Sequence, residues 1–114
     1  YIIIMKPAAE KLAVELDKVT ISDAKIPVGA NVRAEILTKA EDIKASLVAQ
    51  AASPVLWEDC VARMKEFGAD VLLEAGPGKT LCGFNRRIDK TITSLNVEDV
   101  ASLEKSLDYF KEVR

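Results

Sequence analysis

The sequence has no histidine among its 114 residues, so the commonest general base and the commonest metal-binding side chain are both absent. A Ser-His or Cys-His catalytic pair cannot form from these residues, and the G-x-S-x-G pattern of a nucleophile elbow does not occur either. The two cysteines, Cys60 and Cys82, do not form a C-x-x-C pair. We expect both to be reduced residues of the core, and we expect no metal site and no cofactor.

Surplus charge and long apolar runs are also lacking. The net charge is −2, so there is no basic surplus that would favour nucleic acid as a partner. The apolar opening, residues 1–5, runs directly into Lys6-Pro7 and is too short for a membrane span or for the core of a signal peptide. We therefore expect a soluble, cytoplasmic chain. Its length and its 49% hydrophobic content suit a single domain, residues 1–114, with its own core.

Residues 70–84 are the most informative stretch, because they combine a strand, a turn and the start of a helix. Val71-Leu72-Leu73 is a continuous apolar run, as in a strand covered on both faces, and Gly76-Pro77-Gly78 stops it. Gly78-Lys79-Thr80 ends like a phosphate-binding loop. That motif needs a glycine where Leu73 stands, so a plain strand-to-helix turn is the better interpretation.

The remaining elements follow from apolar periodicity and from turn residues. We predict helices opened by Pro7, by a capping box of Thr38 and Glu41, and by Ser53-Pro54, the last of these ending at Phe67-Gly68. Two further helices carry apolar stripes, namely Leu81, Phe84 and Ile88 in one and Val100, Leu103, Leu107 and Phe110 in the other. The predicted strands lie at residues 26–32, 71–73 and 90–95, and because of Pro27 and Gly29 we expect the first to be a short or edge strand. This order predicts an α/β fold with a small, mostly parallel sheet flanked by helices.

Few polar residues stand out as candidates for a site. Asn31 could aim at a ligand or fix a loop, and the loop-fixing role is favoured. Glu41-Asp42 and Glu98-Asp99 are adjacent carboxylates, but at helix starts such residues favour the helix dipole, which argues against acid-base catalysis. Trp57 begins a helical stripe typical of a core, with an exposed binding surface as the alternative. From these residues alone, the chain is not a self-sufficient hydrolase or acyltransferase.

Four stretches nevertheless form one consistent pattern with a known family. They are Met5-Lys6-Pro7-Ala8-Ala9-Glu10-Lys11-Leu12, Ile26-Pro27-Val28 with Asn31-Val32, Gln50 with Ser53-Pro54-Val55 and Trp57, and Glu74 with Gly76-Pro77-Gly78-Lys79, Leu81 and Gly83. In one register from about Met5 to Phe110, the chain closely resembles the C-terminal part of malonyl-CoA:acyl carrier protein transacylases.

The resemblance implies part of an enzyme of fatty-acid biosynthesis. The whole enzyme would transfer a malonyl group from malonyl-CoA to acyl carrier protein through an acyl-serine intermediate, and its fold would be an α/β-hydrolase-like core with an inserted subdomain. The implied partners are malonyl-CoA, acyl carrier protein and the remainder of the acyltransferase domain. The serine, the oxyanion-hole residues and the arginine of the family all precede the matched region, so we expect this chain to be inactive alone.

The resemblance also assigns two positions of this chain to the catalytic site. The family histidine corresponds to Tyr1, whose phenol has an ordinary pKa near 10 and is not expected to act as a general base. Gln50 corresponds to a glutamine whose backbone carbonyl accepts a hydrogen bond from that histidine and fixes its tautomer. The alternative to a part of this enzyme is a stand-alone, non-catalytic α/β interaction module.

Overall fold

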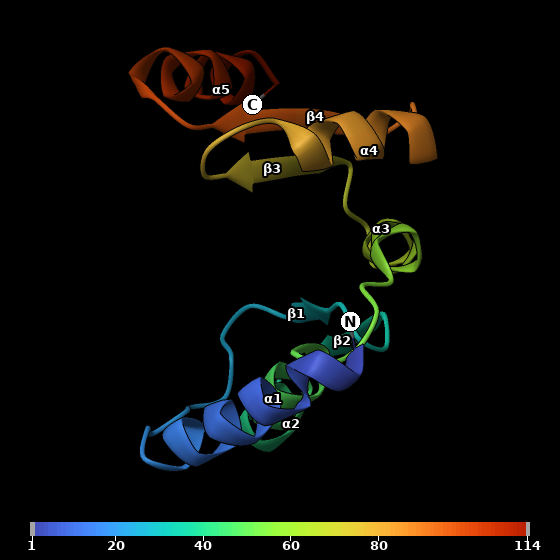
Figure 1. The fold of residues 1–114 in the computed structure, drawn as a ribbon. Helices are drawn as coiled ribbons and strands as arrows, with labels where there is room; N and C mark the ends of the chain where they lie inside the picture. Colours follow the sequence, from blue (N-terminus) through green and yellow to red (C-terminus); the bar gives the residue numbers. More distant parts are fainter. Residues whose placement is uncertain (1, 114) are drawn as a thin grey trace. The chain divides into compact units, whose positions relative to one another are not determined.

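The computed structural model describes residues 2–113, whose contacts group into two compact units, residues 2–64 and 65–113. The elements in chain order are α1 (Ile2–Asp17), β1 (Val28–Ala30), β2 (Glu35–Leu37), α2 (Ala40–Gln50), α3 (Trp57–Glu66), β3 (Val71–Ala75), α4 (Thr80–Ile88), β4 (Thr93–Val97) and α5 (Val100–Val113) (Figure 1). This arrangement of small sheets and flanking helices confirms the predicted α/β class. Because one folding domain can contain two groups of contacts, the single domain over residues 1–114 stays a prediction.

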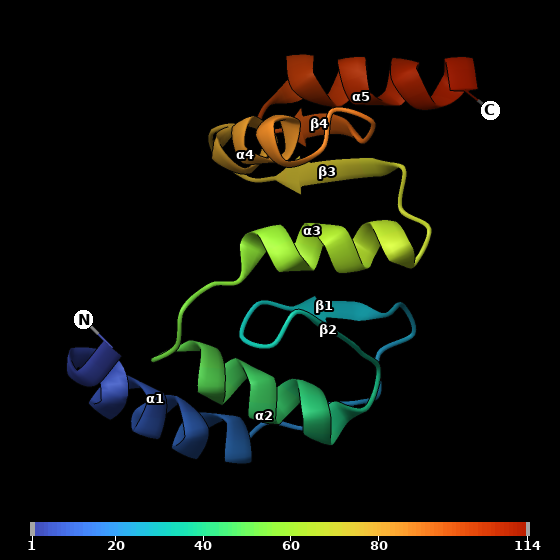
Figure 2. The same ribbon diagram turned by 90° about the vertical axis from the view of Figure 1, so that its right-hand side faces the viewer.

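In the first unit, α1 lies beside α2, as Figure 2 shows. The prediction that Pro7 opens this helix is wrong, because the described helix already begins at Ile2 and Pro7 lies inside it. Inside a helix, proline removes one hydrogen bond and its ring crowds the carbonyl four residues earlier, yet α1 continues through Pro7 to Asp17. Within residues 2–113, no helix has both the length and the hydrophobicity needed to cross a membrane.

The strand predicted within residues 26–32 is short, as expected, and it belongs to a hairpin. β1 pairs antiparallel with β2, with Val28 opposite Leu37 and Ala30 opposite Glu35. The turn contains no glycine. Instead, Ala34 takes the left-handed backbone conformation with φ of 50°. Because alanine rarely adopts that conformation, the sequence carried no usual signal for this hairpin.

The start of α2 differs from the predicted capping box. The N-cap residue is Lys39, which makes no side-chain cap, so the prediction that Thr38 and Glu41 cap each other is wrong. The carboxylate of Asp23 takes this role from a distant part of the chain, accepting the Ala40 N–H at 2.8 Å. A cap supplied from outside the helix satisfies the same free amide, but local spacing does not reveal it.

The helix predicted to open at Ser53-Pro54 begins only at Trp57. The Ser53 hydroxyl donates backwards to the Ala49 carbonyl of α2, so it fixes the end of one helix and does not cap the next. In α3, Cys60 and Val61 are buried, and the Cys60 thiol lies 3.5 Å from the Ala30 carbonyl of the hairpin. This confirms that the helical stripe beginning at Trp57 contributes to a core.

In the second unit, β3 and β4 form a parallel pair, with Val71 beside Thr93 and Ala75 beside Val97. The helix α4 that connects them packs against both strands, while α5 packs against β4 (Figure 2). β3 (Val71–Ala75) confirms a strand at residues 71–73, but the prediction that it is covered on both faces is wrong, because Leu73 is 49% exposed. The strand predicted at residues 90–95 starts later, at Thr93, and continues to Val97.

The helices of the second unit bury small residues where the sequence predicted large apolar stripes. Cys82 of α4 and Ser106 of α5 are buried and donate to the Leu95 and Asn96 carbonyls of β4 at 3.2 Å each. By contrast, Phe84 is 44% exposed and Leu107 48% exposed. Small side chains bring a helix close to a strand, so here they form the contact. Both cysteines are buried and free of disulfides, as predicted.

Candidate functional site

Gln50, the candidate that the sequence singled out, is the last residue of α2. Its backbone carbonyl accepts one long bond, at 3.4 Å, from the Ser53 amide. The final carbonyls of a helix have no partner in the next turn, and together they carry the partial negative charge of the helix dipole. This carbonyl therefore has a free lone pair in a position that favours a cationic donor such as a protonated imidazole.

The direction of that carbonyl is fixed by the turn that follows α2. Ala51 keeps helical dihedral angles, with φ of −60° and ψ of −28°, and its amide donates to the Val48 carbonyl at 3.3 Å. The Ser53 hydroxyl donates to the Ala49 carbonyl at 2.6 Å. These bonds continue the helix as a tightened last turn, so the Gln50 carbonyl keeps the orientation of a helix terminus. Tyr1, the other predicted site residue, lies outside the described residues, so the pairing of the two positions stays a prediction.

A second polar centre lies where β3 meets α4. The Glu74 carboxylate accepts the Leu81 amide at 3.3 Å and the Cys82 amide at 2.9 Å. The bond from the Cys82 amide is the main reason that the pKa of Glu74 is lowered, so this carboxylate is ionised at neutral pH. The N-terminus of α4 thus already holds an anion from the chain itself.

The glycine turn before α4 is anchored in the same way. Gly76 and Gly78 have φ of 133° and 84°, a region that other residues avoid, and the Gly78 amide donates to the Glu98 carboxylate at 2.7 Å. Two carboxylates therefore occupy the amides with which a phosphate-binding loop would hold its ligand. This confirms the interpretation of Gly78-Lys79-Thr80 as a strand-to-helix turn.

The Cys82 thiol is not activated as a nucleophile. Burial is the largest cause that raises its pKa, Glu74 raises it further, and these causes outweigh Arg86 and Lys79, which act to lower it. The protonated thiol donates to the Leu95 carbonyl, so it serves as a contact between α4 and β4. Burial also raises the pKa of Cys60. Among residues 2–113, no three side chains of the metal-binding types gather closely enough to hold a metal ion.

The other polar candidates have structural roles. The Asn31 carbonyl accepts the Leu56 amide at 3.0 Å, and its side-chain oxygen lies 3.8 Å from the Cys60 thiol, which supports the loop-fixing role. Asp99 accepts the Ser102 amide at 2.8 Å, while the Ser102 hydroxyl accepts the Asp99 amide at 3.1 Å. This reciprocal pair caps α5. Asp99 therefore caps a helix start, as the sequence indicated, and Glu41 and Asp42 lie in the first turn of α2, whereas Glu98 holds the Gly78 amide.

Sequence reasoning missed three basic side chains that face one groove in the second unit, namely Lys79, Arg86 and Lys105. Arg86 lies in α4, whereas Lys79 precedes this helix as its N-cap residue, with non-helical dihedral angles of φ −135° and ψ 26°. Helical spacing therefore does not predict that the two side chains line one groove. The contribution of Lys105 from α5 depends on the tertiary fold, and no local pattern contains it.

Comparison with known proteins places this fold in a defined class. No protein-family model matches the chain. Among solved structures, it superposes on the malonyl CoA-acyl carrier protein transacylase of Clostridium perfringens with a TM-score of 0.88 and 42% identity, over 95% of this chain and 34% of that one. A malonyl-transacylase solved with a type II PKS acyl-carrier protein gives a TM-score of 0.84 and 42% identity, over 92% of this chain and 34% of that one. The fold is thus that of a part of an acyltransferase.

Curated sequences give the same result. The chain is 38% identical over 109 residues to the malonyl CoA-acyl carrier protein transacylase of Bacillus subtilis, a match that covers 96% of this chain and 34% of the relative. It is 43% identical over 99 residues to the enzyme of the same name from Haemophilus influenzae, covering 87% of this chain and 32% of that relative. The relatives and structural neighbours of this chain are therefore malonyl-CoA:acyl carrier protein transacylases, and the chain spans about a third of their length.

Proposed function

We propose that this chain is the C-terminal portion of an enzyme that transfers a malonyl group from malonyl-CoA to acyl carrier protein in fatty-acid biosynthesis. The observation that carries the proposal is the match itself, which spans 95% of the chain in one superposition and includes both compact units. A stand-alone interaction module is less well supported, because its sequence would have no reason to keep this match to an enzyme along both units.

In the complete enzyme, the remainder of the acyltransferase domain would supply the serine nucleophile and the arginine for the malonyl carboxylate. By resemblance, the position of the histidine base corresponds to Tyr1 of this chain, so a chimera that keeps the histidine of its host would supply that base. The contribution of this chain would be the Gln50 carbonyl at the end of α2. A histidine whose Nδ1–H donates to that carbonyl presents its other nitrogen to the serine hydroxyl as the proton acceptor. The negative end of the α2 dipole would then stabilise the imidazolium that forms when the serine attacks.

The proposed partners follow from the same role. They are malonyl-CoA as donor, acyl carrier protein as acceptor, and the remainder of the acyltransferase domain. The relative solved with an acyl-carrier protein supports the second of these. A cytoplasmic location is proposed as well, on the basis of the fatty-acid synthesis role.

A chimera tests the function directly. The last third of the Clostridium perfringens enzyme, which is 42% identical to this chain, would be replaced by the matching residues of this chain, with the catalytic histidine kept from the host. We expect the chimera to transfer malonyl groups from malonyl-CoA to acyl carrier protein. We expect the 114-residue chain alone to form no acyl-protein detectable by mass spectrometry. Changing Tyr1 to His should not alter the second result, because the serine is still absent.

Two controls make this experiment decisive. Circular dichroism must show that the chimera is folded, and the host enzyme with its serine replaced must give no transfer. A folded chimera without activity would contradict the proposal. A serine-dependent transfer by the 114-residue chain alone would contradict the view that it is only a part of the enzyme.

A further inference from the structure

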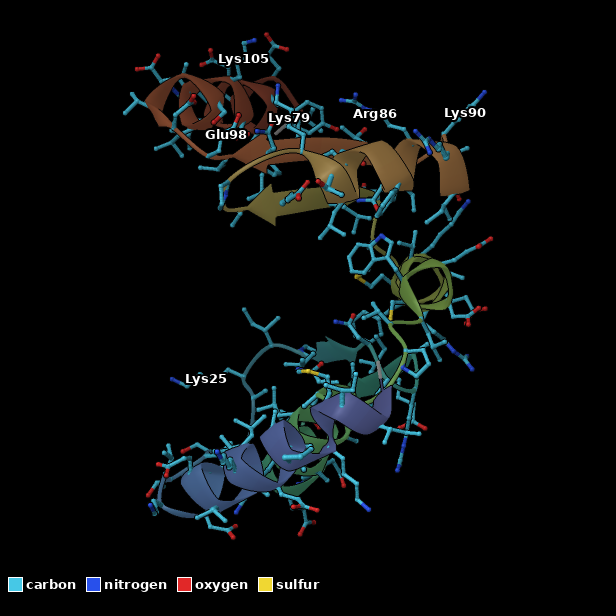
Figure 3. The ribbon with its side chains drawn as sticks, in the orientation of Figure 1. Lys25, Lys79, Arg86, Lys90, Glu98 and Lys105 are labelled. Atoms are coloured by element: carbon cyan, nitrogen blue, oxygen red, sulfur yellow. The ribbon has the colours of Figure 1, made fainter. Side chains whose placement is uncertain are left out.

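The second unit contains a groove of about 350 Å³ between α4 and α5, beside β4. Its lining includes Lys79 from the turn before α4, Arg86 from α4 and Lys105 from α5, whose side chains are labelled in Figure 3. Among the described residues, none of these three cations forms an ion pair. Three positive charges therefore line one recess. The pKa of Asp99 is lowered mainly by the hydrogen bond from the Ser102 amide, and Lys79 and Lys105 lie near enough to contribute to that lowering.

The floor of the groove presents hydrogen-bond donors. Ser94 and Asn96 of β4 line the groove, and the Ser94 hydroxyl and the Asn96 side-chain nitrogen are buried without a partner within residues 2–113. A buried polar group without a partner costs free energy, so such groups usually have a ligand or a water. The amide nitrogen of Asn96 can only donate, so its partner must be an acceptor.

The backbone of β4 adds donors on the same side. The Thr93 amide donates to Asp70 and the Val97 carbonyl accepts from Gly76, so the odd-numbered residues of β4 bond toward β3. In a parallel pair, the alternate residues point their backbone groups to the opposite edge. The amides of Ser94 and Asn96 therefore face outward, on the edge of β4 away from β3, while the Asn96 carbonyl is already bonded to the Ser106 hydroxyl.

Two carboxylates, Glu98 and Asp99, also line the groove, and both are held by other groups. Glu98 accepts the Gly78 amide, and Asp99 accepts both the amide and the hydroxyl of Ser102. These bonds hold the carboxylates at the turn that leads into α5. The charges of the lining side chains sum to a positive value, because three cations face two anions.

We propose that this groove binds a phosphate group, either free or as a monoester, with Arg86 and Lys105 as its principal charged contacts. A phosphate carries between one and two negative charges and acceptor oxygens in several directions, which suits cations from two helices and donors from one strand edge. A guanidinium group can donate two hydrogen bonds to two oxygens of one phosphate, and a lysine ammonium adds a compact positive charge. This site would be additional to the malonyl transfer proposed above and does not rest on it.

Equilibrium dialysis of the full chain against radiolabelled inorganic phosphate, at constant ionic strength, tests the proposal. We expect saturable binding of one phosphate per chain. Arg86→Met and Lys105→Met should each weaken it roughly tenfold, as expected for the loss of one charge-assisted hydrogen bond. Lys25→Met is the matched control, because it removes one positive charge from the other unit, and it should bind like the unchanged chain.

A floor variant and a second ligand complete the test. Asn96→Asp keeps the side-chain shape but replaces a donor by a negative charge, so binding should be abolished. Repeating the dialysis with glycerol phosphate, a monoester, distinguishes the two kinds of ligand. If glycerol phosphate binds more tightly than inorganic phosphate, the ligand is a monoester; if it binds more weakly, the ligand is free phosphate. Binding that does not saturate, or that falls equally in the Lys25 and Arg86 variants, would overturn the proposal. Circular dichroism of each variant excludes loss of fold as the cause.

Discussion

The role proposed for Gln50 belongs to its backbone carbonyl, so side-chain and backbone changes at this turn should differ. In the active chimera, Gln50→Ala keeps the acceptor and should cost little activity. Ala51→Pro should cost far more, because proline restricts the residue before it and removes the Ala51 amide that donates to Val48. Loss of an orienting aspartate costs on the order of 10⁴-fold in related triads, and a neutral carbonyl should matter less.

Steady-state malonyl transfer by the two variants measures this difference, with circular dichroism as the check on folding. If Gln50→Ala lost as much activity as Ala51→Pro, the side chain would carry the role. The assignment of Gln50 to the carbonyl acceptor would then be wrong.

Asp89 gives a prediction about pH. Its pKa is lowered to about 2, first by the hydrogen bond from Lys65 and then by bonds from Thr91. A lowered pKa means that the folded state favours the carboxylate. Its contribution to stability is therefore present above the ordinary value of 3.8 and is lost as the pH falls toward 2. We expect Lys65→Ala to raise the Asp89 pKa toward its ordinary value, as measured by NMR titration of the carboxyl carbon.

Two comparisons test the cause of that shift. Lys90 follows Asp89 directly in the sequence but is not among the groups that lower the Asp89 pKa. Lys90→Ala should therefore leave the titration of Asp89 unchanged. Urea unfolding should show Asp89→Asn losing stability at pH 6 but little near pH 2. An Asp89 pKa that stayed near 2 in Lys65→Ala would assign the shift to Thr91 instead.

At the scale of elements, the join between α2 and α3 depends on Ser53. Its hydroxyl donates to the Ala49 carbonyl at 2.6 Å in a partly buried position. Ser53→Ala should lower the free energy of unfolding by about 1 kcal/mol, the usual net value of such a bond. Urea unfolding followed by Trp57 fluorescence measures it, since Trp57 opens the next helix. Ser22→Ala, an exposed serine, should have no comparable effect, and equal losses in both variants would contradict the role of Ser53.

The elements also show where sequence reasoning succeeds. β3, the turn and α4 were predictable because glycine and proline mark their boundaries locally, and Gly68 takes the left-handed conformation expected after α3. The β1–β2 hairpin was missed because Ala34 occupies the position where glycine would have marked a turn. The start of α2 was misplaced because its cap comes from Asp23, outside any local motif.

The candidate site was predictable to a different degree. Gln50 was found only through resemblance to a family. Every residue has a backbone carbonyl, so the type of residue at this position does not indicate the role. The groove between α4 and α5 was not predicted, since Lys105 and Arg86 line one groove only because both helices pack on β4. Residues that act through the main chain or through tertiary contact are therefore the ones that a single sequence conceals.

At the scale of the whole molecule, the isolated chain should associate with itself. β3 pairs with β4 on one side, and among the described residues no strand pairs with its other edge. Leu73 on this strand is 49% exposed and Phe84 on the next helix is 44% exposed. An open strand edge beside exposed apolar side chains favours pairing between copies. Sedimentation velocity should therefore show dimers or larger species at micromolar concentration.

Leu73→Lys is the informative variant for this prediction, because a lysine on an edge strand opposes pairing with a second copy. It should shift the chain toward the monomer. Glu104→Lys makes a larger charge change on an exposed helix and serves as the control. A monomeric unchanged chain, or equal effects of the two variants, would contradict association through β3.

The pairings of β1 with β2 and of β3 with β4 have a consequence for how the chain folds. Val28 pairs with Leu37, and Val71 pairs with Thr93, so each sheet joins segments that are close along the chain. Pairs of this kind require little loop closure, and closure entropy is the main cost that slows the folding of sheets. Each unit can therefore begin to form as soon as its own segment leaves the ribosome, without waiting for a strand from a distant part of the sequence.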